Sequence, residues 1–126
     1  METEKKVWRE VGQKQKFLNA FRGLRVFWVA TKIEHLMIYI LGVATSLILG
    51  FYFEVSSLEW VALVFAIGFP IVAEVFNTAI EIDIDLTSPE FHPYARDTKN
   101  VAAGAVLLAS FVAVIVGLIV FLPKIF

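Results

Sequence analysis

The sequence contains no cysteine, so disulfide bonds and cysteine-ligated metal sites are excluded. It also contains neither a GxxxxGK[ST] loop nor a glycine-rich kinase loop, which excludes a phosphate-binding site of either type. Basic residues are scarce beyond the N-terminal part: eight of the eleven Lys and Arg residues lie before residue 33, and only Lys124 follows Lys99. The first 35 residues are too polar to contain the apolar core of a signal peptide, so we expect the N-terminus to be retained.

Apolar side chains, in contrast, are abundant. Hydrophobic residues make up 59% of the 126 positions and the mean hydropathy is +0.76, above the values of an ordinary soluble domain. Three long apolar stretches have one charged residue in their interiors, Glu74, and each can cross a hydrocarbon core of about 30 Å. The sequence therefore predicts a single all-α membrane domain, residues 1–126, with transmembrane helices at about residues 35–53, 58–81 and 99–122.

Residues 5–32 are predicted to form an amphipathic helix ahead of the first span. A basic helix with Trp and Phe on its apolar face suits the headgroup layer of a membrane. The alternative is a helix packed against neighbouring domains. The apolar positions are Trp8, Val11, Phe17, Leu18, Phe21, Leu24 and Trp28, and the basic positions are Lys14, Lys16, Arg22 and Arg25.

The basic residues also predict the orientation of the three spans. With the N-terminus in the cytoplasm, the turn after the first span lies outside and contains no Lys or Arg. Ten basic residues are then inside, including Arg96 and Lys99, and one, Lys124, is outside. This bias is typical of cytoplasmic segments, so we expect a multi-pass protein with a cytoplasmic N-terminus.

Small residues repeat every four positions in the first and third spans. This spacing lets helices approach closely in lipid, where apolar side chains gain no hydrophobic advantage from association. The pattern indicates helix association and says nothing about chemistry. The residues are Gly42, Ser46 and Gly50 in the first span, and Ala105, Ala109, Ala113 and Gly117 in the third.

One polar stripe interrupts the second span. At about 100° per residue, Glu74, Asn77, Glu81 and Asp85 fall on one side of a helix whose other positions are mainly Ala, Val, Ile and Phe. A charged carboxylate near the bilayer centre costs about 2.5–3.5 kcal/mol, which partner groups, a wet cavity or protonation relieve. Glu74 is a candidate general base; the alternative is a protonated carboxyl group that hydrogen-bonds a neighbouring helix.

Further polar residues lie at the membrane edge where Glu81 is expected. Glu81, Asp85 and a carboxylate from elsewhere could hold Mg²⁺, which prefers a few carboxylates together with substrate phosphates. Lys99, Arg96 and His92 could meet those phosphates. Taken alone, each of these residues also fits an ordinary solvated loop position.

The segment 82–100 is predicted to be a loop between the second and third spans. Pro89 and Pro93 punctuate it. Within it, Thr87 or Ser88 is expected to cap a short helix.

Many of these residues belong to a longer pattern. The run E-x-x-N-T-A-I-E that begins at Glu74, inside a membrane helix, is highly specific, and with its flanks it resembles the prokaryotic diacylglycerol kinase family. That family includes the undecaprenol kinases of Gram-positive bacteria. The similarity covers the chain from Phe17 to its end. Its other shared features are Gly23, the Glu59-Trp60 pair, Asp85, His92-Pro93, Lys99 and the closing segment 117–124.

The resemblance implies a surface helix plus three transmembrane helices, assembled as a homotrimer in the bacterial inner membrane. It implies active sites at the cytoplasmic edge, shared between subunits, and transfer of the γ-phosphoryl group of Mg-ATP to a lipid hydroxyl. Glu74 matches the base and Glu81 a metal ligand. The positions expected to bind the nucleotide and its metal are Asn77, Glu81, Asp85, Glu90, Phe91, His92, Lys99 and Asn100.

Two departures from the family pattern affect the expected site. The usual Lys-Asp pair is Lys99-Asn100 here, which replaces a negative charge near the phosphates by a neutral amide. A second metal-binding glutamate normally precedes the first span. Alignment from the upstream glycine places that position on Thr31, and alignment from the downstream motifs places it on Ile33. The acid in this segment is Glu34, so we assign it the role of second metal ligand.

The resemblance therefore implies a lipid kinase that acts on undecaprenol or diacylglycerol. The Glu59-Trp60 pair and the closing segment look more similar to the undecaprenol kinases, which favours undecaprenol. A non-catalytic relative that binds nucleotide or lipid is the main alternative, because of Asn100 and the displaced Glu34. A small channel or proton-relay protein could also use Glu74. That reading leaves the cytoplasmic polar cluster unexplained.

Overall fold

The computed structural model describes residues 12–126, and helices account for most of them. The chain divides into two compact units, one ending at Ala30 and the other beginning at Thr31. Residues 5–11 of the predicted surface helix lie outside the described residues. The helices are α2 (Gln13–Ala30), α3 (Ile33–Tyr52), α4 (Ser57–Thr87) and α5 (Pro93–Ile125).

Helices α3, α4 and α5 are each long and apolar enough to cross a membrane, which confirms the prediction of three spans. Large apolar side chains are exposed on all three, among them Ile48, Phe65 and Ile119. Apolar surface of this extent is typical of contact with lipid or another chain. Within α2, the exposed rings of Phe17 and Phe21 meet edge to face, and the placement of α2 on a membrane surface stays a prediction.

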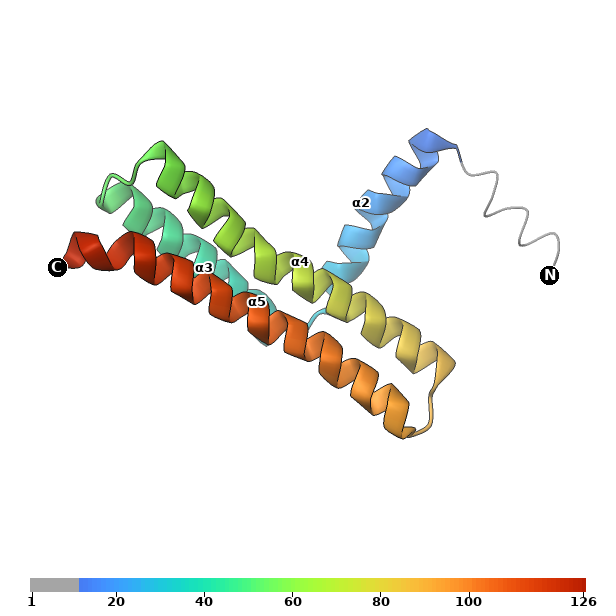
Figure 1. Cartoon of the computed structure of the whole chain (residues 1–126). Helices are drawn as coiled ribbons and strands as arrows, with labels where there is room; N and C mark the ends of the chain where they lie inside the picture. Colours follow the sequence, from blue (N-terminus) through green and yellow to red (C-terminus); the bar gives the residue numbers. More distant parts are fainter. Residues whose placement is uncertain (1–11) are drawn as a thin grey trace. The chain divides into compact units, whose positions relative to one another are not determined.

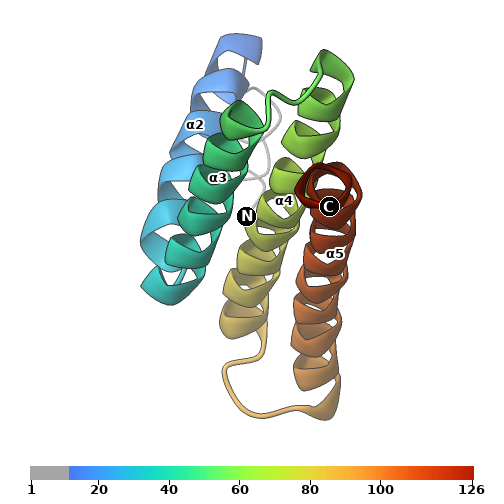
Figure 2. The ribbon, with the colours of Figure 1, turned by 90° about the vertical axis from the view of Figure 1, so that its left-hand side faces the viewer.

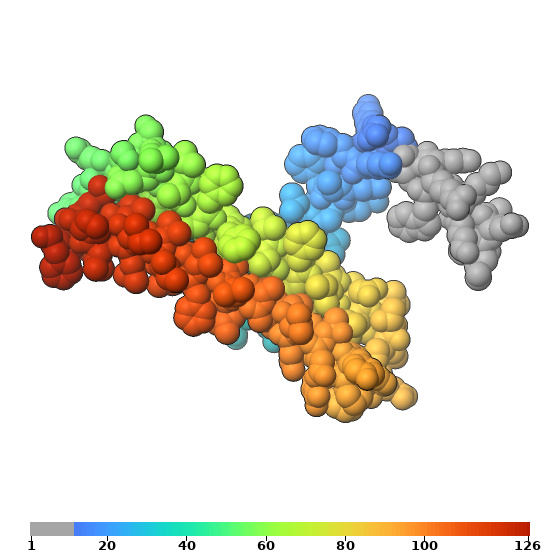
Figure 3. Space-filling view, in the orientation of Figure 1, coloured from blue at the N-terminus to red at the C-terminus, as the bar shows by residue number. Residues whose placement is uncertain are grey.

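The three long helices lie side by side, and consecutive helices run in opposite directions (Figure 1, Figure 2). α4 packs along α5, and α3 packs against α4. The space-filling view shows α4 and α5 in contact along much of their length (Figure 3). Because α3 has 20 residues and α4 has 31, the C-terminal turns of α4 and the first turns of α5 continue past the beginning of α3 (Figure 1).

A capping box at residues 56–59 fixes the turn between α3 and α4. Ser56 Oγ accepts from the backbone N–H of Glu59 at 3.3 Å, and the Glu59 carboxylate accepts from the backbone N–H of Ser56 at 2.7 Å. Glu59 also pairs with Lys124 at 3.1 Å. The pair joins the beginning of α4 to the end of α5.

The apolar core of the bundle lies beside this turn. Leu63 of α4 is 2% exposed and packs with Val55 of the turn and with Val120 and Phe121 of α5. In lipid such packing stabilises through van der Waals contacts rather than through the removal of surface from water. The end of the bundle that carries the capping box therefore also carries this buried apolar cluster.

At the opposite end, α4 and α5 are longer than predicted. α4 continues to Thr87 and α5 begins at Pro93, so the predicted loop 82–100 is wrong and only residues 88–92 connect the helices. Thr87 and Ser88 end α4 instead of beginning a short helix. The polar side chains here therefore lie within helices rather than in a loop. Pro93 suits a first turn because it lacks the N–H that would be unpaired there.

Gly50 of the small-residue repeat is a point of close approach. The indole ring of Trp60 lies directly against it, and a Cβ atom at this position would overlap the ring. Gly42 and Gly117 have open space where a Cβ atom would be. The repeat therefore serves packing within the chain at Gly50, while Gly42 and Gly117 remain available to lipid or another subunit.

Gly50→Ala is expected to lower stability, because the added methyl group overlaps the Trp60 ring and overpacking of this kind costs about 1–3 kcal/mol. Gly42→Ala is the matched control. It is expected to be neutral or stabilising, because Ala favours a helix over Gly by about 1 kcal/mol. Thermal unfolding in detergent, followed by circular dichroism, measures both. Equal midpoints for the two variants would contradict the packing of Trp60 against Gly50.

Candidate active site

Glu74 is buried inside the bundle although it bears a carboxylate, and only 3% of its surface is exposed. Its Oε1 lies 3.0 Å from Nδ1 of His35, and its Oε2 accepts from the hydroxyl group of Tyr39 at 2.9 Å. Both partners come from the first turns of α3. Hydrogen bonds at both oxygens are what allow such a group to be buried without a large loss of stability.

A cavity of about 250 Å³ opens beside Glu74 and is lined by α3, α4 and α5. A second, more apolar crevice of about 200 Å³ shares Ile38, Tyr39 and Ser110 with this cavity and extends to Pro70. A polar group at the end of an apolar crevice suits the head of a molecule with an apolar tail. The α5 wall of the cavity consists of Ala103, Val106, Leu107 and Ser110.

Asn77 lies on α4 one turn from both Glu74 and Glu81. Its amide nitrogen donates to Glu81 Oε1 at 3.5 Å, the long limit of a hydrogen bond. Its carbonyl oxygen Oδ1 is buried and has no partner within the described part of the chain. Because buried acceptors are normally paired, this oxygen marks a position for a donor or a cation that the chain itself does not supply.

The oxygen atoms at this point fit Mg²⁺, which takes one or two carboxylates and completes its coordination with water and substrate phosphates. The Glu81 carboxylate and the unpaired Asn77 Oδ1 have that chemistry. Across residues 12–126, no group of three or more His, Asp or Glu side chains is gathered to hold a metal. Glu34 is exposed, and its assignment as second metal ligand stays a prediction.

Thr31, just before α3, contacts the polar face of α4. It is buried, and its hydroxyl oxygen lies 3.2 Å from the hydroxyl oxygen of Thr78, the residue after Asn77. Two hydroxyl groups therefore join the segment before α3 to α4.

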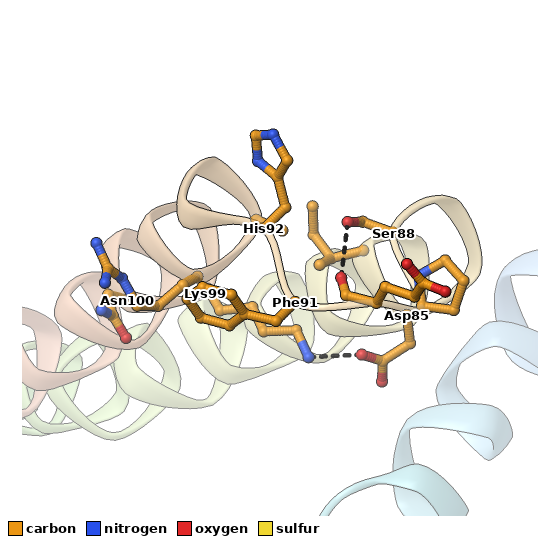
Figure 4. A pocket seen from close by; sticks show the side chains of 11 residues that line it. Asp85, Ser88, Phe91, His92, Lys99 and Asn100 are labelled. Atoms are coloured by element: carbon orange, nitrogen blue, oxygen red, sulfur yellow. Dashed lines mark hydrogen bonds and ion pairs between the residues drawn. The ribbon is translucent and has the colours of Figure 1, made fainter.

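A polar pocket of about 280 Å³ lies at the loop end, between the last turns of α4 and the first turns of α5 (Figure 4). Lys99 Nζ and Asp85 Oδ1 are 2.5 Å apart and join the two helices (Figure 4). Both side chains are partly exposed, so the pair stabilises the fold by about 1 kcal/mol or less and can rearrange around a ligand. The predicted nucleotide-binding residues that line this pocket are Asp85, Glu90, Phe91, His92, Lys99 and Asn100.

His92 has a structural role in this loop. Its Nδ1 accepts from the backbone N–H of Tyr94 at 3.2 Å, which makes His92 the N-cap of α5. In Figure 4 its ring points away from the Lys99–Asp85 pair. The capping contact explains a histidine directly before Pro93, and it leaves Lys99 as the cation that faces Asp85.

Asn100 lines the pocket, whereas Asp97 does not. The Asp97 carboxylate is 2.8 Å from Nη2 and 2.9 Å from Nε of its neighbour Arg96. Asp97 is therefore already paired with a cation at a different position. It does not supply the negative charge that the family pattern has at Asn100.

The predicted residues fall into two groups that α4 connects. The Glu74 cavity and the loop pocket share no lining residue. Glu74 faces the first and Asp85 the second, and eleven residues of α-helix span about 16 Å. Asn77 and Glu81 lie between them on the same face of α4.

Sequence reasoning missed His35 and Tyr39 as members of the site. Their signal was present: two polar side chains four residues apart inside an apolar span lie on one helix face. Nothing in the sequence shows that this face meets Glu74, because that contact depends on how far α3 is shifted along α4. The contact between Thr31 and Thr78 also depends on this shift, so the sequence does not show it.

Glu74 is thus a buried carboxylate at the end of an apolar crevice, and the same helix carries the edge of the polar pocket. The family model described as prokaryotic diacylglycerol kinase matches residues 18–121. The chain is 37% identical over 109 residues to the undecaprenol kinase of Bacillus subtilis (strain 168), covering 86% of each protein. No solved structure matches the chain significantly.

Two further curated relatives are named diacylglycerol kinase. The Helicobacter pylori (strain ATCC 700392 / 26695) protein is 33% identical over 86 residues, 68% of this chain and 66% of the relative. The Escherichia coli (strain K12) protein is 27% identical over 99 residues, 76% of this chain and 77% of the relative. The class that the fold and these matches define is a membrane lipid kinase. Within that class, the chain belongs to the prokaryotic diacylglycerol kinase family.

Asn100→Asp is expected to raise the rate of lipid phosphorylation at limiting Mg²⁺ by up to about tenfold, which corresponds to about 1.4 kcal/mol. The reason is that a carboxylate in the pocket would attract the cation that accompanies the nucleotide. Initial rates measured across a Mg²⁺ titration check this. Asp97→Asn is the control and is expected to change little, because Asp97 pairs with Arg96. An unchanged or lower rate for Asn100→Asp would mean that the neutral amide is suited to this site.

Proposed function

We propose that this protein transfers the γ-phosphoryl group of Mg-ATP to the primary hydroxyl group of a membrane lipid alcohol. The observation that carries the proposal is Glu74, a buried carboxylate beside a cavity whose continuation is apolar. A lipid whose hydroxyl group reaches this carboxylate keeps its tail against apolar side chains. Membership of a lipid kinase family supports the same reaction.

Glu74 acts as the general base. One of its oxygens accepts the proton of the lipid hydroxyl group as the hydroxyl oxygen forms its bond to the γ-phosphorus atom. The bond between that phosphorus atom and the β–γ bridging oxygen breaks, and ADP leaves with the electron pair. Removal of this proton contributes about 10²- to 10⁴-fold to rates of this kind, and the remainder comes from positioning and charge neutralisation.

The loop pocket holds the nucleotide. Lys99 leaves its pair with Asp85 to contact phosphate oxygens, and Asn100 and the backbone of residues 88–92 form the rest of the pocket wall. Bound Mg²⁺ would neutralise the phosphate charge, with Glu81 and Asn77 as its protein ligands and Glu34 as the further predicted ligand. Asn77 also keeps Glu81 oriented, because its amide group donates to that carboxylate.

Undecaprenol is the substrate that we favour, with diacylglycerol as the alternative. The relative of which this chain covers 86% is named undecaprenol kinase. The crevice that leads away from Glu74 is lined mainly by Ile, Val, Ala and Pro side chains, with Tyr39 and Ser110, and suits an isoprenoid chain and an acyl chain equally. A side-by-side assay with both lipids separates them.

We further propose that the protein works as a homotrimer in the bacterial inner membrane, with the N-terminus and the nucleotide pocket in the cytoplasm. The family resemblance and the excess of basic residues in the predicted cytoplasmic segments support this. The broad exposed apolar surface of α3, α4 and α5 leaves room for contacts between subunits.

Glu74→Gln is expected to lower kcat by about 10²- to 10⁴-fold with little change in KM for Mg-ATP, because the amide cannot take the proton. The assay is ATP-dependent phosphorylation of undecaprenol and of diacylglycerol in detergent micelles. Glu54→Gln, in the turn at the other end of α4, is the control. Full turnover by Glu74→Gln would rule out the base assignment. Mg-ATP binding by the unaltered protein without phosphate transfer to either lipid would instead identify a non-catalytic relative.

Mixing of two inactive variants tests whether the active site is shared between subunits. If Glu74 of one chain works with the loop pocket of the next, Glu74→Gln and Lys99→Ala reassembled at equal amounts should regain about one quarter of full activity, since half of each position is intact. If each chain holds a complete site, every site in the mixture keeps one defect and no activity returns. Each variant reassembled alone provides the baseline.

A further inference from the structure

Glu74 receives both of its hydrogen bonds from one helix. His35 and Tyr39 are four residues apart on α3, so they lie on the same face, and each reaches a different oxygen of the carboxylate. In the described part of the chain, His35 is also the only ion-pair partner of Glu74. The position of the carboxylate in the cavity is therefore set by α3 rather than by α4 alone.

The hydrogen-bond chemistry defines which group donates. An ionised carboxylate only accepts, so the Tyr39 hydroxyl group donates to Oε2, and His35 must bear a proton on Nδ1 to donate to Oε1. The last torsion of a glutamate side chain is otherwise broad and weakly fixed. Two donors on opposite oxygens remove that freedom and fix the plane of the carboxylate.

The contacts leave the carboxylate free to react. Its two oxygens offer about four lone-pair positions, and His35 and Tyr39 occupy one on each oxygen. A hydroxyl group that enters the cavity can still donate to Glu74. The His35 side chain is 46% exposed, whereas the Glu74 side chain that it contacts is 4% exposed.

From this geometry we propose that His35 and Tyr39 are positioning residues, which hold the Glu74 carboxylate in the orientation that receives the proton of the lipid hydroxyl group. The proposal rests on the proposed function and adds to it two residues of the first span. A general base must be held close to its productive geometry, and a displacement of about 1 Å can cost about 100-fold in rate. The two side chains act through Glu74, not on the substrate.

The test uses four variants of the full chain. Tyr39→Phe removes only the hydroxyl group, and His35→Ala removes the imidazole. His35→Gln keeps a donor that can reach the carboxylate. Tyr52→Phe is the matched control, because Tyr52 is at the other end of α3 and 76% exposed. Circular dichroism and the thermal midpoint of each variant report whether it folds.

Two measurements separate positioning from a general structural effect. In steady-state kinetics, Tyr39→Phe and His35→Ala should each lower kcat by about 10- to 100-fold, with KM for Mg-ATP unchanged. His35→Gln should retain more of kcat than His35→Ala. In infrared spectra of protein with ¹³C-carboxyl glutamate, the unaltered protein minus Glu74→Gln isolates the carboxylate band of Glu74. That band should shift in Tyr39→Phe and stay in place in Tyr52→Phe.

Each outcome bears on the proposal. Unchanged kcat and an unchanged Glu74 band in Tyr39→Phe and His35→Ala would overturn it. A parallel loss of kcat, Mg-ATP binding and helical signal would also overturn it, because the residues would then only hold the fold. If the unaltered protein phosphorylates neither lipid, the proposed function fails, and the infrared band still tests whether α3 holds the carboxylate.

Discussion

Burying the Glu74 carboxylate among three apolar helices carries a desolvation cost that nearby hydrogen-bond donors offset. His35 and Tyr39 are those donors, and they reach Glu74 because the first turns of α3 lie against the middle of α4. The same shift of α3 along α4 brings Thr31 to Thr78. It also leaves the C-terminal turns of α4 to pair with α5 beyond the start of α3 (Figure 1). The hydrogen bonds of Glu74 and the Thr31–Thr78 contact therefore depend on the same shift of α3 along α4.

The two ends of the bundle have different physical characters. At one end, the capping box, the Glu59–Lys124 pair and the cluster around Leu63 hold all three helices together. At the other end, α4 and α5 are joined by residues 88–92 and by the exposed Lys99–Asp85 pair. Weakly held polar segments are the ones that can rearrange when a ligand binds. The end with the capping box therefore stabilises the fold, and the end with residues 88–92 can rearrange when a ligand binds.

The sequence predicted the three spans because long, mainly apolar stretches of that length have few alternatives. Six of the predicted nucleotide-binding residues line one pocket because they are close along the chain, and their role stays a prediction. The loop predicted from the polar residues 82–100 was wrong, because a helix that leaves lipid needs no break. Prediction also failed where the contact is distant in sequence: 39 residues separate His35 from Glu74, and only packing brings them together.

The uninterrupted α4 helix has a consequence for which molecules the protein can use. One rigid element carries Glu74 and, about 16 Å away, the edge of the loop pocket at Asp85. In the proposed orientation, α4 holds Glu74 at a fixed distance inside the lipid from the aqueous edge at Asp85. In the proposed reaction, the protein would select an alcohol by the depth of its hydroxyl group in the bilayer, before the shape of its tail matters. Two lipids with unrelated tails but with hydroxyl groups at the same depth would then be phosphorylated alike.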